Sequence, residues 1–231
     1  MNLKFAILFF FGICLVKSAA IAQNEINQTD ANGLRQGPWQ KKFAGTNQLR
    51  YEGQFKDGKE VGLFKFYCED CKSQPMVTKS FSGDTAEVKY YTVKGKLVSE
   101  GKMQGKKRIG EWVYYQEKSK AVMTRETYSN GELEGLKTTY YPHGQIAEEL
   151  HYKNGLKQGP NNYYAPNGIL LKKLTYVDDK LEGVGTYYDS NGTVEIEGNY
   201  RKGKKHGLWK YYKNGELVKE ETFPKPRKKG N

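Results

Sequence analysis

The two cysteines of the segment Cys68-Glu69-Asp70-Cys71 are the residues whose type and spacing most directly suggest chemistry. A redox-active thiol needs a lowered pKa, usually at a helix N-terminus, and no helix is expected here. A zinc site needs four ligands, and the chain has no second Cys or His pair at a suitable spacing. In an exported chain, such a pair is typical of a disulfide. We therefore predict that Cys68 and Cys71 are bonded across a short turn.

The other residues with catalytic potential do not form a recognisable site. His143 and His206 fall in predicted turns and His151 in a predicted strand, so they are interpreted as surface residues. Glu148-Glu149 and Glu220-Glu221 are adjacent in strands, so the two carboxylates of each pair point to opposite faces. The chain has no nucleophile elbow, phosphate-binding loop or metal-ligand motif. The sequence therefore predicts no enzyme, no catalytic residue, no metal site and no cofactor.

The chain is basic, with a formal net charge of +12. Basic residues cluster around two predicted turns and could form a basic binding edge for an anionic surface. The alternative is that these are ordinary lysine-rich turns, because lysines also keep a sheet edge from pairing with a neighbour. No arginine–aromatic pattern for stacking on bases appears, so nucleic acid is not expected. The candidate residues of this edge are Lys102, Lys106, Lys107, Arg108, Lys202, Lys204, Lys205 and His206.

The first residues have the pattern of a secretory leader. Lys4 precedes the short apolar run from Phe5 to Val16, and Ala20-Ile21-Ala22 is a small-x-small cleavage site. The apolar run is too short for a membrane span. We expect a signal peptide over residues 1–22, a flexible lead-in over 23–31, and no membrane span after cleavage. The protein is then periplasmic or extracellular.

The elements that must position these residues are repeats. Glycines recur about every two dozen residues, a period that indicates a repeat architecture. Opening turns such as Asn130-Gly131 and Asn154-Gly155 recur in phase with them, and Asn-Gly is a strong hairpin signal. The other opening turns are placed at Asn32-Gly33, Asp57-Gly58, Ser82-Gly83, Gln104-Gly105, Asp178-Asp179 and Lys202-Gly203.

Two turns in each unit leave two short strands, with no helical periodicity between them. In Trp112-Val113-Tyr114-Tyr115, alternate residues share a face, and Tyr-Tyr pairs such as Tyr140-Tyr141 return in later units. The predicted fold class is all-β: an elongated, twisted antiparallel sheet of about eight hairpins over residues 32–223. Residues 224–231 read as a basic disordered tail.

The unit resembles the MORN repeat, in the longer bacterial variant found in tandem arrays, over nearly all of residues 32–223. The resemblance implies structural roles for its glycine and aromatic positions and no catalytic residue. Similar proteins are grouped with an antitoxin-type repeat family, and MORN proteins with membrane association and scaffolding. These structural positions are Gly110, Trp112, Gly135, Tyr140, Gly159, Tyr164, Gly183, Tyr188, Gly207, Trp209 and Tyr212.

Two function classes follow. The first is an exported, non-enzymatic binding or scaffolding module in the cell envelope, expected to be monomeric and to hold a protein or an anionic envelope component. The alternative is an antitoxin-like protein that masks a toxin. A leader peptide favours the first, because most antitoxins must meet their targets in the cytosol.

Overall fold

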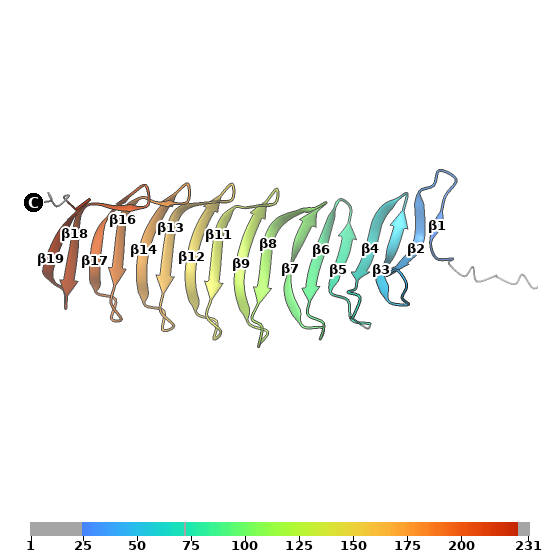
Figure 1. Ribbon diagram of the computed structural model, residues 1–231, viewed down its shortest axis with the longest axis horizontal. Helices are drawn as coiled ribbons and strands as arrows, with labels where there is room; N and C mark the ends of the chain where they lie inside the picture. Colours follow the sequence, from blue (N-terminus) through green and yellow to red (C-terminus); the bar gives the residue numbers. More distant parts are fainter. Residues whose placement is uncertain (1–24, 72, 226–231) are drawn as a thin grey trace, which may run out of the picture.

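The computed structural model describes residues 25–71 and 73–225. The expected signal peptide and nearly all of the basic tail lie outside these residues. The described chain forms one antiparallel sheet without a helix, in which successive strands pair with each other and the two end strands do not meet (Figure 1). Its strands are β1 (Gln28–Thr29), β2 (Arg35–Lys42), β3 (Leu49–Lys56), β4 (Lys59–Phe66), β5 (Val77–Ser82), β6 (Thr85–Tyr91), β7 (Leu97–Gln104), β8 (Lys107–Tyr115), β9 (Val122–Ser129), β10 (Glu132–Leu133), β11 (Gly135–Tyr140), β12 (Ile146–Lys153), β13 (Leu156–Tyr164), β14 (Leu170–Val177), β15 (Lys180–Leu181), β16 (Gly183–Tyr188), β17 (Val194–Arg201), β18 (Lys204–Lys213) and β19 (Glu216–Phe223).

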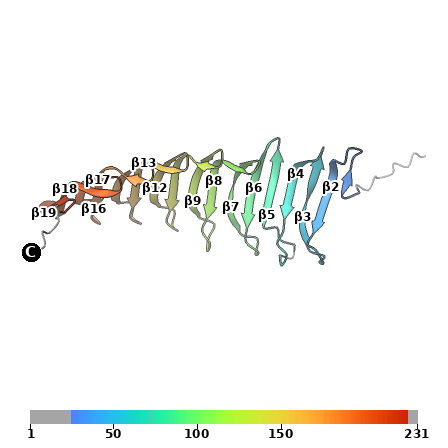
Figure 2. The ribbon, with the colours of Figure 1, turned by 45° about the horizontal axis from the view of Figure 1, so that its top comes forward.

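The predicted fold class is confirmed. From β2 onward the strands form eight hairpins, if β10 with β11 and β15 with β16 each count as one interrupted strand. The sheet is elongated and twisted, since turning the molecule shows β2 to β9 nearly face on and β16 to β19 nearly edge on (Figure 2). Within the predicted lead-in, Gln28–Thr29 forms β1 and pairs with β2, where the sequence predicted no strand.

The opening turns have the backbone that their sequences require. Asn154 and Gly155 both have positive φ, 51° and 78°, and close the tight turn between β12 and β13. Two turns differ in register from the prediction, and Asn32-Gly33 lies in a longer turn, because Thr29 pairs with Arg35. Ser82 pairs with Thr85 and Gln104 with Lys107, so the turn residues are Gly83-Asp84 and Gly105-Lys106. In both, glycine at the first turn position takes the positive φ.

The repeat glycines bend the strands. Gly159 has φ 94°, and the register of β12 against β13 shifts beside it, between Leu150 and Tyr152. Gly207 has φ 68° and lies at the equivalent shift between β17 and β18. A β-bulge inserts residues into one strand and increases its local twist. The structural role predicted for the repeat glycines therefore corresponds to a regular series of bulges.

A single row of cross-strand neighbours forms the core of the sheet. Three of its aromatic side chains, Phe64, Trp112 and Trp209, are fully buried although the sheet has only one layer. Each of these rings lies over a glycine of the preceding strand: a Cβ added to Gly101 would fall 2.4 Å from Trp112, and one added to Gly198 2.3 Å from Trp209. We call this series the core row: Trp39, Gly53, Phe64, Lys79, Val88, Gly101, Trp112, Glu126, Lys137, Leu150, Asn161, Leu174, Gly185, Gly198, Trp209 and Glu221.

The core row lies on one face of the sheet. We call the face that carries it the core face and the opposite one the outer face, since side chains alternate along each strand. Aromatic rings two residues away pack on the core row from both sides. Tyr200 meets Trp209 edge to face, with ring centroids 5.0 Å apart, and Tyr128 meets Trp112 at 6.5 Å.

Adjacent units are joined at their opening turns by a recurrent hydrogen bond. Glu134 and Glu182 each stand directly before a repeat glycine. Their carboxylates accept the backbone N–H of Asn154 and Lys202, both at 2.8 Å. Gln158 accepts from Asp178 in the same way, at 3.0 Å. In these units, one unit supplies an acceptor for the turn of the next, as expected in an array stabilised by neighbour contacts.

Candidate binding surfaces

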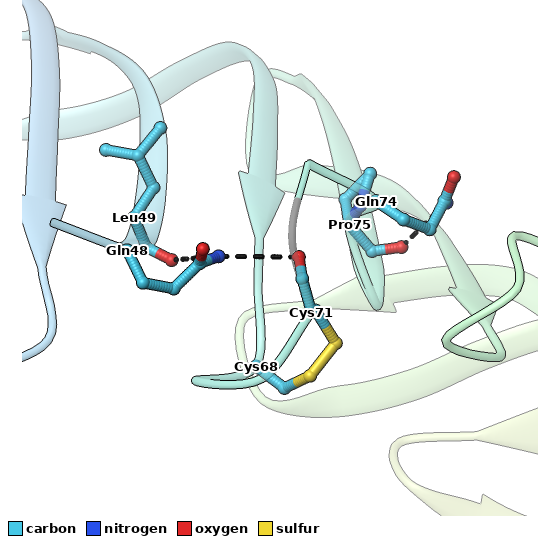
Figure 3. Close-up of a disulfide and its surroundings, with 6 residues drawn as sticks. All are labelled: Gln48, Leu49, Cys68, Cys71, Gln74 and Pro75. Atoms are coloured by element: carbon cyan, nitrogen blue, oxygen red, sulfur yellow. Dashed lines mark hydrogen bonds between the residues drawn. A yellow bond between two sulfur atoms is a disulfide. The ribbon is translucent and has the colours of Figure 1, made fainter. Parts of the chain in front are cut away.

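The cysteine pair lies in the turn between β4 and β5 (Figure 3). Cys68 and Cys71 form a disulfide, with their Cα atoms 5.0 Å apart. The Cys71 side chain is buried, and its backbone carbonyl accepts a hydrogen bond from the Gln48 amide at 3.4 Å. The bond therefore ties down the longer second turn of its unit rather than presenting a thiol to solvent. No group of three or more metal-ligating side chains occurs among the described residues.

The predicted basic edge is divided by the structure. Lys106 and Lys107 lie at the turn before β8, where Lys107 Nζ donates to Asn130 Oδ1 at 2.7 Å. Arg108 instead lies on the core face, with its guanidinium 4.5 Å from the centre of the Trp112 ring. Lys102 is exposed on the outer face of β7.

The second cluster divides in the same way. Lys202 and Lys204 are exposed at the turn, and His206 is exposed beside Asn199 on β17. Lys205 turns to the core face and stacks on Trp209, with Nζ 4.0 Å from the ring centre. Equivalent turns also carry acids, among them Asp178 and Asp179. The two clusters therefore form no continuous basic edge of their own, and each contributes one cation to the core face.

The core face combines aromatic rings with cations and a half-buried ion pair. Burial raises the pKa of Glu126, but hydrogen bonds from Lys137 and Tyr128 bring it below its ordinary value. Lys137 Nζ lies 2.9 Å from this carboxylate, and the Tyr128 hydroxyl donates to it at 2.7 Å. Arg108 donates to the hydroxyls of Tyr114 and Tyr128 at 2.6 and 3.1 Å. The cations of this face are held in fixed positions by neighbouring rings and carboxylates.

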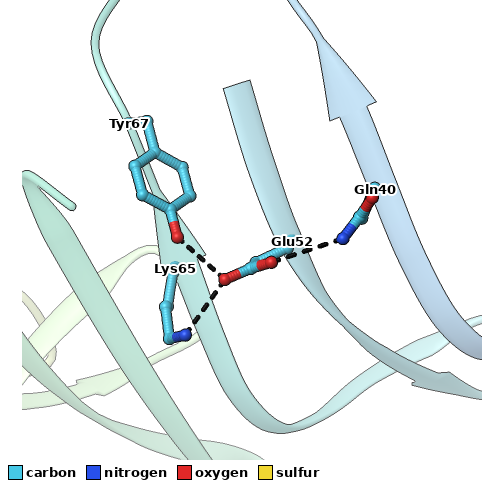
Figure 4. A network of polar contacts seen from close by, with 4 residues as sticks. All are labelled: Gln40, Glu52, Lys65 and Tyr67. Atoms are coloured by element: carbon cyan, nitrogen blue, oxygen red, sulfur yellow. Dashed lines mark hydrogen bonds and ion pairs between the residues drawn. The ribbon is translucent and has the colours of Figure 1, made fainter. Parts of the chain in front are cut away.

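The outer face repeats a different motif, in which a tyrosine near the second turn donates to a glutamate. Tyr67 donates to Glu52 at 2.8 Å, and Lys65 Nζ lies 3.0 Å from the same oxygen (Figure 4). Hydrogen bonds from Tyr67 and Lys65 lower the pKa of Glu52. Burial and the bond to Glu52 raise the pKa of Tyr67 to about 12. The motif returns at Tyr115 with Glu100 and at Tyr164 with Glu149.

The pair Tyr140-Tyr141 is displaced by one residue relative to the later Tyr-Tyr pairs. Tyr140 pairs with Ile146 as Tyr164 pairs with Leu170, so Tyr140 holds the position of the second tyrosine of each pair. Tyr141 lies past the strand end and stacks on His143, with ring centroids 5.7 Å apart. The spacing in the sequence already contains this shift, because Tyr140 follows its repeat glycine, Gly135, by five residues, whereas Tyr163 follows Gly159 by four.

Sequence reasoning also missed the residues that make the core row possible. Gly101 and Gly198 stand outside the glycine period and have ordinary φ, yet only glycine leaves room for the facing tryptophan. The cations that stack on the rings were missed as a group, although Arg108 precedes Trp112 and Lys205 precedes Trp209 by only four residues. An Arg or Lys two residues before a repeat glycine, as at Arg108 and Lys205, is the signal that could have found them.

Comparison with protein-family models identifies the repeats. The model described as "MORN repeat variant" matches residues 133–154, 181–202 and 205–223. No curated protein matches the chain. The described part of the chain also holds no helix with the length and apolarity that crossing a membrane requires. Such repeats indicate a binding or scaffolding module. The matches at these three segments identify this chain as a MORN-type repeat protein.

Proposed function

We propose that this protein is an exported, non-enzymatic binding module that holds another component of the cell envelope on its sheet. The observation that carries the proposal is the core face, where a repeating array of rings and cations runs across the hairpins and offers one long surface. A surface of this kind suits binding, because aromatic residues and fixed cations supply contact area and charge without a reacting group.

Two further features support export. The pattern of residues 1–22 is that of a cleaved leader. The disulfide between Cys68 and Cys71 is the kind of bond that persists in oxidising compartments outside the cytosol.

The test is to map the N-terminus of the protein from fractionated cells and to crosslink the mature form in envelope extracts at low and high salt. We expect an N-terminus near Gln23 and a partner captured in the envelope fraction. Charged contacts at exposed sites weaken at high salt, because the Debye length is about 8 Å at physiological ionic strength. Loss of the partner at high salt then assigns binding to the cations, and retention assigns it to the rings.

One result would overturn the proposal. A cytosolic protein that keeps residues 1–22 could not meet an envelope component. The antitoxin-like interpretation would then become the better one, and a toxin that copurifies from the cytosol would establish it.

A further inference from the structure

The two faces of the sheet hold their cations differently. On the outer face, three cations pair with carboxylates: Lys65 with Glu52, Lys89 with Glu100 and Arg125 with Glu111. The core face is basic. Its carboxylates are Glu60, Glu126, Glu148 and Glu221, whereas its cations are Arg35, Lys41, Lys79, Arg108, Lys137, Lys157, Lys172, Lys205 and Lys219.

Most core-face cations lie on aromatic rings instead of on carboxylates. Lys172 Nζ lies 5.4 Å from the centre of the Tyr163 ring, and Lys157 Nζ 5.0 Å from that of Tyr176. Lys79 occupies the same kind of position over Phe66, at 5.4 Å. Among the described residues, these three lysines form no ion pair. A ring attracts a cation without neutralising it, so the charge stays available to an anionic ligand.

The same stacking indicates which anionic ligand fits. Nucleic-acid bases bind single-strand proteins by stacking on free ring faces, and here lysines and arginines occupy faces of those rings. What remains for a ligand is ammonium groups beside tyrosine hydroxyls, such as the paired hydroxyls of Tyr187 and Tyr200, 2.6 Å apart. Ammonium groups bind carboxylates, and phenol hydroxyls exchange hydrogen bonds with alcohols. A carboxylated sugar offers both.

The shape of the sheet favours a linear polymer over a flat surface. Because the sheet twists along its length, the core face does not lie in one plane and cannot rest along its whole length on a membrane (Figure 2). Equivalent positions recur once per hairpin, about 9.6 Å apart for two strand spacings. An extended polysaccharide is a flexible chain with evenly spaced anions on a similar scale, so it can follow the twist and meet successive cations.

We propose that the core face binds a linear acidic polysaccharide, with its carboxylates on the ring-stacked cations and its hydroxyls on the tyrosines. The proposal deepens the binding function above and rests on it. None of Lys79, Lys157 and Lys172 stacks on a tryptophan. Lys157 and Lys172 lie outside the core row, and Lys79 is a half-buried member of it, so each is replaced by glutamine, which keeps most of the side chain and removes the charge.

The experiment measures the affinity of the disulfide-bonded chain for alginate, a linear polyuronate, by calorimetry at two salt concentrations. The test variant is Lys79→Gln, Lys157→Gln and Lys172→Gln together. The control is Lys102→Gln, Lys173→Gln and Lys210→Gln, which removes the same charge from the outer face. We expect the test variant to lose at least ten-fold in affinity, with a weaker salt dependence, and the control to lose less than two-fold. If a triple variant does not fold, the neighbours Lys172→Gln and Lys173→Gln give the same comparison.

Several outcomes would overturn the proposal: no binding of alginate, equal losses in both variants, or equally tight binding of polyglutamate or of phosphatidylglycerol vesicles. Polyglutamate carries the carboxylates without the sugar hydroxyls, and the vesicles carry anions on a surface. Crosslinking in envelope extracts distinguishes a wrong ligand from a wrong function. If both triple variants still capture that partner while alginate does not bind, the binding module stands and the polysaccharide is wrong.

Discussion

The substitution Gly198→Ala tests the structural basis of the core row. The added methyl group would lie 2.3 Å from Cδ2 of Trp209, far inside contact distance. Trp209 cannot easily move away, because it is fully buried, donates from Nε1 to the Asn199 carbonyl at 3.1 Å, and is covered by Lys205 and Tyr200. Gly198 has no positive φ, so the strain is steric and does not come from the backbone.

The expected cost is that of overpacking a filled core, about 1–3 kcal/mol. For a chain of this size, that lowers the melting temperature by roughly 2–12 °C. Without the ring, the same change would stabilise the strand by about 0.5–1 kcal/mol, because alanine is stiffer than glycine in the unfolded chain. A lower melting temperature therefore supports the steric clash with Trp209, and a higher one supports the effect on the unfolded chain alone.

The assay is thermal unfolding by circular dichroism of four proteins: wild type, Gly198→Ala, Trp209→Leu and the double variant. Leucine leaves room for the methyl group, so we expect Gly198→Ala to cost much less in the Trp209→Leu background. Hydrogen exchange should show the loss of protection concentrated in β17 and β18. Equal costs in both backgrounds, or a higher melting temperature for Gly198→Ala, would refute the reasoning.

Three other predictions follow from single contacts. Folding lowers the pKa of Glu52 from its ordinary value of 4.5, so its contribution to stability is full above that pH and is lost as the pH falls through the lower folded value. Glu52→Gln should reduce the fall in melting temperature at acid pH. A fall as steep as that of the wild type would contradict this prediction. Reduction of the Cys68–Cys71 disulfide should cost about 2 kcal/mol or less in chemical denaturation, since its loop is short, and a loss of the whole fold would be inconsistent with that. Lys202 has φ 52°, so Lys202→Gly should raise the melting temperature by about 2–4 °C, whereas Glu182→Ala should lower it by removing the acceptor for the Lys202 amide.

The sequence by itself determined the elements and their order. Asn-Gly turns such as Asn154-Gly155 and the glycine period act through local backbone conformation, and local conformation is what a linear pattern records. Alternation along each strand then predicted which neighbouring residues point to opposite faces, as at Glu148 and Glu149. These features fixed the all-β class and the number of hairpins before any contact was known.

Only the tertiary structure decided which face each charge occupies and what covers it. Gly207 and Leu208 form a bulge between the residues that pair with Gly198 and Asn199 of β17. This bulge places the Lys205 side chain over the Trp209 ring, away from the exposed lysines that are its neighbours in the sequence. The close fit of Gly198 to Trp209 likewise depends on the register between two strands. Register is set jointly by turns and bulges along the whole hairpin, so no single residue pattern contains it. The basic core face is therefore a property of strand pairing rather than of composition.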